Sequence, residues 1–164
     1  MENTQGKQIS TSNVKPNLGF FDNGAHYYPV HVFYNHTDAG QIVYFANYLR
    51  MTEEARVAMF YLLGNTDAAG YNEIKFTGDF VVRSCQADYF KSAILNDDLV
   101  VVSKVSEVGK VHIILTQDIY RDSELLVSVK FKLVFVRVCS CGAHKPTRVP
   151  EFWLDKIQNL TENK

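Results

Sequence analysis

Residues 44–63 read YFANYLRMTEEARVAMFYLL and carry the one long helical pattern of this sequence. Apolar side chains recur there at steps of three and four residues, which places them along one side of a helix. Gly64 follows at a position where helices commonly end. The opposite side is only partly polar, because Met51, Val57 and Phe60 add apolar surface. We therefore expect a helix that the rest of the chain covers on more than one side.

The chain after this helix has the residue pattern of β-strands. We predict strands at Phe80–Tyr89, Leu99–Val108, Lys110–Arg121 and Glu124–Val138. Apolar and polar residues alternate most clearly in the last of these, so one face is expected in the core and the other in water. Only one or two residues separate the last three segments, which predicts antiparallel hairpins.

The segments at either end complete the layout. A strand is expected from Tyr28 to Tyr34, ahead of a cluster of turn-forming residues at 35–40. A short helix is expected to open at Pro150. One strand, a long helix and then several antiparallel strands together describe an α+β domain.

The composition is that of an ordinary globular protein. The chain has 164 residues, 46% hydrophobic and 21% charged, with a formal net charge of -1. This balance argues against nucleic-acid binding, and no apolar run approaches the roughly 20 residues that span a membrane. The first residues lack the apolar segment of a secretory signal, so we expect a cytoplasmic protein. Residues 1–24 are mostly polar, and we expect a flexible N-terminal arm there, ahead of a single domain at 25–164.

The turn at residues 37–40, Thr-Asp-Ala-Gly, is where catalytic chemistry is indicated. It places the carboxylate of Asp38 just ahead of the long helix, whose first N–H groups have no partner within the helix. A carboxylate and free N–H groups together can polarise a carbonyl oxygen and supply a base or a nucleophile. The alternative is that Asp38 only caps or closes the turn, because aspartate is common at such positions for local reasons.

Other catalytic and metal-binding motifs are missing from the sequence. It contains no phosphate-binding loop, Rossmann glycine fingerprint, Gly-x-Ser-x-Gly motif or His-Glu-x-x-His motif. Cys139, Cys141 and His144 are too few and too closely spaced for an ordinary structural zinc site. We therefore expect no metal site.

Residues 34–49, YNHTDAGQIVYFANYL, continuing to Glu54-Ala55-Arg56, resemble the signature of hotdog-fold thioesterases. The resemblance is to the YbgC-type acyl-CoA thioesterases and the 4-hydroxybenzoyl-CoA thioesterase group, and it covers nearly everything after Tyr28. It implies a hotdog fold, in which a curved antiparallel sheet wraps the long helix. It also implies hydrolysis of acyl-CoA, or a related acyl thioester, to a free acid and CoA. No cofactor is implied, because coenzyme A is part of the substrate.

The resemblance also implies two catalytic roles. The family's acidic residue falls on Asp38, as nucleophile or general base, and the amide that holds the carbonyl oxygen falls on the backbone N–H of Phe45. YbgC-type proteins usually have a histidine where this sequence has Phe45, and often another acid where it has His36. A backbone donor tolerates such a change, but any part played by that imidazole is absent here. His36 is interpreted as a turn residue, with electrostatic compensation as the alternative.

Three further residues are expected to bind the substrate. Tyr44 and Tyr48 are expected to line the acyl pocket, with a simple core role as the alternative. Arg83 is expected to offer positive charge to coenzyme A, with a solvated surface role as the alternative.

The resemblance implies a homodimer or homotetramer, in which sheets join and active sites are shared between subunits. The expected substrate is acyl-CoA, with links to an acyl carrier protein or to the Tol-Pal system left open. The alternative function is a non-catalytic hotdog scaffold associated with the Tol-Pal cell envelope system, and hydratase chemistry on the same fold is a third. The retained residues 37–40 favour the hydrolase, whereas the missing histidine at Phe45 weakly favours the scaffold.

Overall fold

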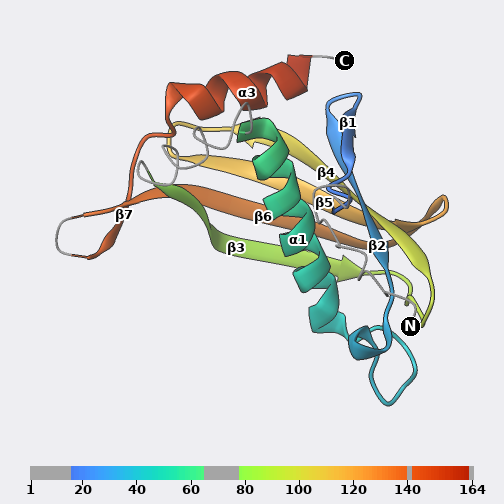
Figure 1. Cartoon of the computed structure of the whole chain (residues 1–164). Coiled ribbons are helices and arrows are strands. Elements are labelled where there is room, and N and C mark those ends of the chain that lie inside the picture. The colour runs from blue at the N-terminus through green and yellow to red at the C-terminus, as the bar shows by residue number, and fades with distance from the viewer. Residues whose placement is uncertain (1–15, 65–77, 140–141, 163–164) are drawn as a thin grey trace, which may run out of the picture.

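The computed structural model describes residues 16–64, 78–139 and 142–162. A curved antiparallel sheet of seven strands carries the long helix α1 (Phe45–Gly64) across one face (Figure 1). This arrangement agrees with the expected α+β hotdog architecture. The strands lie in the order β1 (Phe20–Asp22), β2 (Ala25–His31), β4 (Asp98–Val108), β5 (His112–Arg121), β6 (Glu124–Val138) and β3 (Asp79–Tyr89), and β7 (His144–Pro146) also pairs with β6.

The four long strands lie close to where the sequence predicts them, and β6 has the predicted bounds. β5 begins at His112 rather than Lys110, because the preceding turn is closed by the Gly109 N–H, which donates to the His112 carbonyl over 2.8 Å. In β6, apolar residues at alternate positions, Val127, Val129, Phe131, Leu133 and Phe135, are buried, as the alternation predicts.

The first predicted strand corresponds to β2, and its observed bounds differ from the predicted ones at both ends. β2 runs from Ala25 to His31, whereas Tyr28 to Tyr34 was expected. Beyond His31 the chain bends into a short 3-10 turn at Tyr34–His36, in which the Thr37 N–H donates to the Tyr34 carbonyl over 3.2 Å. Pairing with β4 therefore stops earlier than the alternating pattern suggested.

The end of the expected N-terminal arm belongs to the sheet. β1 pairs with β2 across a turn at Asn23 and Gly24, which have φ of 45° and 73°. Two successive residues with positive φ match the Asn-Gly type of hairpin turn, which suits the twist of the flanking strands. Residues 1–15 lie outside the described part of the chain, so a flexible arm there stays a prediction.

The core lies between α1 and the sheet. The buried side of α1 meets apolar residues from β4, β5 and β6, including Val101, Leu115 and Leu133. The α1 residues buried in this way are Tyr48, Met51, Thr52, Ala55, Ala58, Met59 and Leu63. This burial explains why a helix of modest amphipathicity is stable in this position.

One buried polar group links α1 to the middle of the sheet. The side-chain amide of Gln117 on β5 donates to the Thr52 carbonyl and to the Ser103 hydroxyl, each over 2.9 Å. Its oxygen accepts a hydrogen bond from the Arg56 guanidinium over 3.1 Å, and that guanidinium lies 4.7 Å from the ring centre of Phe131. Both the oxygen and the nitrogen of this buried amide are satisfied, as burial requires.

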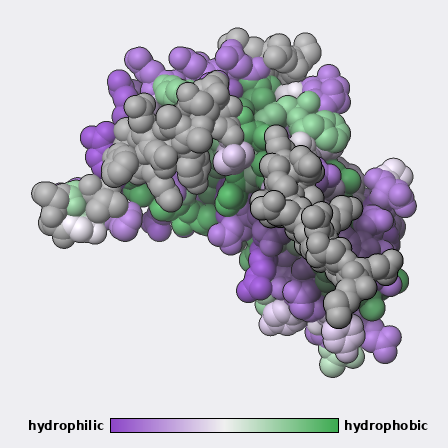
Figure 2. Space-filling model, viewed as in Figure 1, coloured by the Kyte–Doolittle hydropathy of each residue, from purple (hydrophilic) through white to green (hydrophobic). Residues whose placement is uncertain are grey.

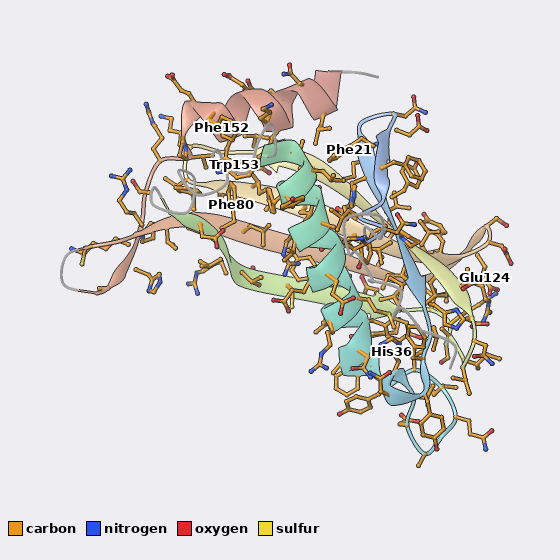
Figure 3. All side chains as sticks on the ribbon, in the orientation of Figure 1. Phe21, His36, Phe80, Glu124, Phe152 and Trp153 are labelled. Atoms are coloured by element: carbon orange, nitrogen blue, oxygen red, sulfur yellow. The ribbon has the colours of Figure 1, made fainter. Side chains whose placement is uncertain are left out.

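The C-terminal helix α3 (Glu151–Glu162) covers the end of the core near the C-terminus of α1. Trp153 and Phe80 lie beside that end of α1 and form an aromatic cluster with Phe60, with ring centres 5.2 to 6.2 Å apart (Figure 3). On the visible face, apolar residues gather around the same end of α1 (Figure 2). In the part of the chain that the structure describes, no helix is long and apolar enough to cross a membrane.

Candidate active site

Asp38 lies in a tight turn that leads into α1. Its N–H donates to the Ile42 carbonyl, and its own carbonyl accepts from the Gln41 N–H, each over 3.0 Å. An isolated antiparallel bridge between Thr37 and Val43 closes the base of the turn. These bonds hold the backbone of Asp38 in one place.

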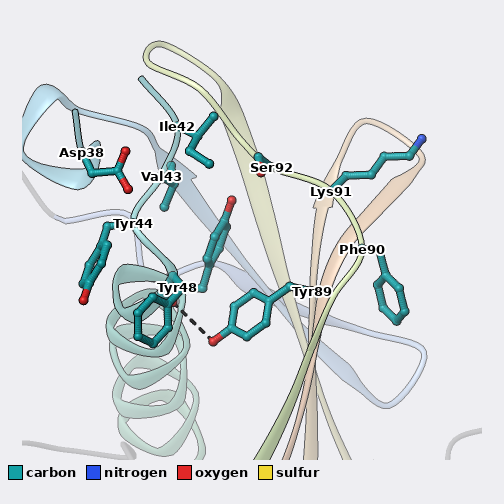
Figure 4. A pocket seen from close by; sticks show the side chains of 10 residues that line it. Asp38, Ile42, Val43, Tyr44, Tyr48, Tyr89, Phe90, Lys91 and Ser92 are labelled. Atoms are coloured by element: carbon teal, nitrogen blue, oxygen red, sulfur yellow. Dashed lines mark hydrogen bonds between the residues drawn. The ribbon is translucent and has the colours of Figure 1, made fainter. Parts of the chain in front are cut away.

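The Asp38 carboxylate takes part in the turn with one of its two oxygens. Oδ1 accepts the Gly40 N–H over 2.7 Å, which is the local role that aspartate often plays in turns. No other hydrogen bond or ion pair from the described residues reaches this exposed carboxylate. One oxygen is therefore left for a ligand, and the carboxylate points inward above the start of α1 (Figure 4).

The start of α1 supplies unused N–H groups beside this carboxylate. The Tyr44 N–H donates a hydrogen bond to the His36 carbonyl oxygen over 3.0 Å, and the Asn47 side-chain amide donates to the same oxygen over 2.8 Å. Within the described residues, the N–H of Phe45 has no recorded acceptor, as expected for the first residue of a helix. Its position makes it a hydrogen-bond donor for an oxygen atom of a ligand.

Asp38 and Phe45 line the same hollow, of about 330 Å³, which we call the helix-side hollow (Figure 4). Its walls come from the turn, from the first turn of α1 and from the chain that follows β3. The lining residues are Asp38, Ile42, Val43, Tyr44, Phe45, Tyr48, Tyr89, Phe90, Lys91 and Ser92.

The aromatic walls of the helix-side hollow contact one another. The Tyr89 ring meets the Phe45 ring edge-on at 6.3 Å and the Tyr48 ring at 6.0 Å. The buried Tyr48 hydroxyl accepts the Ala93 N–H over 2.8 Å. Burial raises the pKa of both Tyr48 and Tyr89, so both hydroxyls stay protonated at neutral pH.

Four of the five predicted site residues meet here. Asp38, Tyr44, Phe45 and Tyr48 all line the helix-side hollow, whereas Arg83 does not. Arg83 lies on β3 where the pairing with β6 shifts register between Val82 and Ser84, and it is exposed there. Arg83 was predicted as a substrate-binding residue from its charge alone, and charge does not predict how far a residue lies from the turn that holds Asp38.

The cation that does line the helix-side hollow is Lys91, which forms an ion pair with Glu124. His36 lies outside this lining and accepts the Phe33 N–H at Nδ1 over 3.1 Å, which agrees with its interpretation as a turn residue. Tyr89, Phe90 and Ser92 were not predicted as site residues. Their only signal was position, because Tyr89 ends a strand that runs past the start of α1, and Phe90 and Ser92 follow it.

A second hollow, of about 550 Å³, lies against the same turn, and we call it the turn-side hollow. It shares Asp38 and Ile42 with the helix-side hollow. Its lining residues are Tyr34, Thr37, Asp38, Gly40, Gln41, Ile42, Ile94 and Leu95.

A charged cluster holds the segment that forms one wall of each hollow. Arg121 at the end of β5 binds Asp97 over 2.8 Å and Glu124 over 2.6 Å. The same Asp97 oxygen accepts the Ile94 N–H over 2.9 Å. Hydrogen bonds from Lys91 and Arg121 lower the pKa of Glu124, so its carboxylate stays ionised and the cluster stays paired at neutral pH.

Comparison with known proteins places this chain in a family. Residues 40–128 match the family model of the thioesterase superfamily. The acyl-CoA thioesterase YbgC of Haemophilus influenzae is 35% identical over 130 residues, which are 79% of this chain and 91% of that protein. The acyl-CoA thioester hydrolase YbgC of Escherichia coli O6:H1 is 31% identical over 101 residues, which are 62% of this chain and 73% of that protein.

A solved structure shows the same fold. The 4-hydroxybenzoyl CoA thioesterase of Pseudomonas sp. strain CBS-3 matches with a TM-score of 0.72 at 16% identity, over 80% of this chain and 98% of that one. Together with the sequence matches and the sheet that carries α1, this likeness shows that the chain belongs to the thioesterase superfamily and has its hotdog fold.

Proposed function

We propose that this protein hydrolyses acyl-CoA thioesters to a free acid and coenzyme A. The observation that carries the proposal is that Asp38 and Phe45 line one hollow, and that the Phe45 N–H has no partner among the described residues. Thioester hydrolysis needs these two groups, because negative charge develops on the carbonyl oxygen while a nucleophile attacks the carbon. The two YbgC relatives carry the same activity in their names.

Each group has a definite task in the reaction. The Phe45 N–H donates a hydrogen bond to the carbonyl oxygen of the thioester. This hydrogen bond strengthens as negative charge develops on that oxygen. Removing one such donor typically costs about a hundredfold to a thousandfold in turnover. The backbone supplies this donor, so it does not depend on having a histidine side chain at position 45.

Asp38 supplies the attack by one of two routes. As a base, its free oxygen takes a proton from a water molecule while that water's oxygen bonds to the carbonyl carbon. As a nucleophile, the same oxygen bonds to the carbon itself and forms a mixed anhydride, which water then hydrolyses. In both routes the C–S bond breaks and the sulfur of coenzyme A leaves with the electron pair, as a thiolate that takes up the proton released by the water. Coenzyme A is therefore a product, and no separate cofactor is needed.

The sheet edge supports assembly as a homodimer. Among the described strands, β3 pairs only with β6, so along its 11 residues the other edge presents backbone N–H and C=O groups that have no strand partner. Val81 and Val82 are exposed on this strand. A second copy pairing with this edge satisfies those groups and covers the valines. Because β3 ends at Tyr89 in the helix-side hollow, the partner subunit then lies next to the site, and a homotetramer is a pair of such dimers.

The test is a hydrolysis screen with the full chain. Short, long and aromatic acyl-CoAs and one acyl carrier protein thioester are supplied, and released thiol is measured against buffer and against Asp38→Asn. We expect turnover of at least one acyl-CoA and a solution mass of two or four chains. A folded protein that releases no thiol from any of them contradicts the hydrolase and favours the scaffold alternative, and a monomer at micromolar concentration contradicts the shared site.

A further inference from the structure

The turn that carries Asp38 is held at its two ends by different parts of the molecule. At its exit, the Val43 N–H donates to the Ala93 carbonyl over 2.9 Å, which fastens the turn to the chain that follows β3. Its entry is His36, two residues before Asp38 and beside the start of α1 (Figure 3). The position of Asp38 therefore depends on how His36 is held against the helix.

The side-chain amide of Asn47 holds this entry. Its Nδ2 donates to the His36 carbonyl oxygen over 2.8 Å, and the Tyr44 N–H donates to the same oxygen over 3.0 Å. A carbonyl oxygen has two lone pairs, so these two donors fill its acceptor capacity. Among the described residues, Asn47 makes the only recorded side-chain hydrogen bond from α1 to residues 36–43.

This bond takes the place of an ordinary helix cap. Tyr44, the residue before α1, has no short polar side chain of the kind that caps a helix. Asn47 lies in the first turn, where its own N–H donates to the Tyr44 carbonyl over 2.8 Å and its side chain reaches away from the helix to His36. The helix start is thereby tied to the turn without using the N–H of Phe45, which has no partner among the described residues.

The turn itself has a conformation that needs such support. Gln41 has φ of 62°, in the left-handed region that residues other than glycine rarely adopt. Its N–H donates to the Asp38 carbonyl over 3.0 Å, so the strained residue and Asp38 belong to the same closed turn. Such a conformation persists only where the surrounding contacts hold it. Loss of a contact at either end of the turn should therefore let Asp38 shift.

We propose that Asn47 is a positioning residue, which holds the Asp38 carboxylate in the place beside the Phe45 N–H that attack on a thioester needs. This inference rests on the proposed function and adds one residue to it. Asp38 belongs to the turn and Phe45 to the helix, so their separation depends on the bond that joins the two. Asn47 does not line the helix-side hollow, so it acts through the backbone at His36 and not on the substrate.

The test compares three variants in steady-state hydrolysis of the best acyl-CoA. Asn47→Leu has a side chain of similar size without the N–H donor, and Asn47→Ala also lacks the donor but favours a helix. Both should lower kcat about ten- to hundredfold, because a small displacement of a reacting group is costly in the transition state. KM should change by about threefold or less, because the contacts that bind the substrate are retained. Asn47→Gln keeps the amide on a longer arm, and its kcat should exceed that of Asn47→Leu by about threefold or more.

Two measurements separate positioning from a general loosening of the fold, and circular dichroism checks that each variant is folded. Asn159→Leu, at an exposed position of α3, should leave both kcat and KM unchanged. The second measurement uses the double variant of Asp38→Asn with Asn47→Leu. Because Asn47 acts through Asp38, adding Asn47→Leu should lower the residual turnover of Asp38→Asn by less than about threefold, whereas independent effects would multiply.

Five results overturn the proposal. They are a kcat of Asn47→Leu or Asn47→Ala within about twofold of the wild type, a loss that appears in KM instead of kcat, no recovery in Asn47→Gln, a full further loss in the double variant, and failure of both Asn47→Leu and Asn47→Ala to fold. If the wild type hydrolyses acyl-CoAs while any of these is found, the positioning role fails and the thioesterase stands. If the wild type releases no thiol from any acyl-CoA, both fail.

Discussion

The hydroxyl of Tyr89 donates to the carbonyl of Phe45 over 3.4 Å and joins the last residue of β3 to the first residue of α1. These two residues are far apart in the sequence, yet their rings also meet edge-on. The contact fixes the edge strand against the helix end that offers the free N–H. The same strand edge is the surface on which we propose that a second subunit pairs.

Removing the Tyr89 hydroxyl tests whether this contact positions the helix end. Tyr89→Phe keeps the ring and loses one hydrogen bond, so the free energy of unfolding should change by about 1 kcal/mol or less. We expect kcat/KM for the best acyl-CoA to fall about three- to tenfold, because the Phe45 N–H is held less firmly. Tyr27→Phe, which removes a hydroxyl away from the site, is the control. Equal effects of the two variants on kcat/KM would show that the Tyr89 hydroxyl does not position the start of α1.

The buried amide of Gln117 should matter mainly for stability. Gln117→Ala leaves the Arg56 guanidinium without this acceptor and opens space beside α1, so we expect a loss of about 2 to 4 kcal/mol. Lys130→Ala, at an exposed position on β6, should change stability by no more than about 0.5 kcal/mol. Urea unfolding of both variants measures the difference. A Gln117→Ala protein as stable as the control would show that the amide link is not needed.

Local pattern accounts for much of the fold. The helix was predicted because its apolar residues repeat at helical spacing through Leu63, and β6 because Val127 to Phe135 alternate with polar residues. Asp38 and Phe45 are seven positions apart across one turn, so their meeting also follows from the local chain. Tyr89 and Leu95 lie near the turn that holds Asp38 only because β3 runs past the start of α1. No local sequence pattern predicts that long-range arrangement. Arg83 was predicted as a substrate-binding residue from its charge alone. Charge does not predict the direction of a side chain at an irregular position of a strand.

The charged cluster should make stability depend on pH in the acid range. Hydrogen bonds from Lys91 and Arg121 lower the pKa of Glu124 in the folded state below its ordinary value of 4.5. The stabilisation is therefore complete above that value and is lost as the pH falls through the lower, folded-state pKa. Melting curves from pH 6 to pH 3 should show the wild type losing more stability than Glu124→Gln. Parallel curves for the two proteins would contradict a role for Glu124 in this loss.

A second pH dependence is expected nearer neutrality. His26 on β2 is buried, its Nε2 bonds to the Leu18 carbonyl over 2.8 Å, and its Nδ1 has no partner among the described residues. Burial lowers its pKa below the ordinary value of 6.5, and the bond to Leu18 opposes this only in part. A group whose folded pKa is lowered stabilises the fold above its unfolded pKa, and that stability is lost as the pH falls.

The measurement is urea unfolding at pH 7, 6 and 5. The wild type should lose stability across this range, and His26→Gln, which keeps an N–H donor for Leu18 but cannot titrate, should lose less. His144→Gln, at an exposed histidine on β7, should behave like the wild type. A His26→Gln protein with the full wild-type pH dependence would show that other groups cause it.

The central claim is that Asp38 acts on the substrate as well as closing its own turn, and Asp38→Asn separates the two roles. An asparagine oxygen can still accept the Gly40 N–H, so the free energy of unfolding should stay within about 1 kcal/mol of the wild type. The charge and the basic oxygen are lost, so turnover of the best acyl-CoA should fall by about a hundredfold to ten-thousandfold or more. Asp122→Asn, a second turn carboxylate, with φ of 51°, should alter neither quantity. A folded Asp38→Asn protein that turns over its substrate within a few-fold of the wild-type rate would contradict the mechanism proposed for this site.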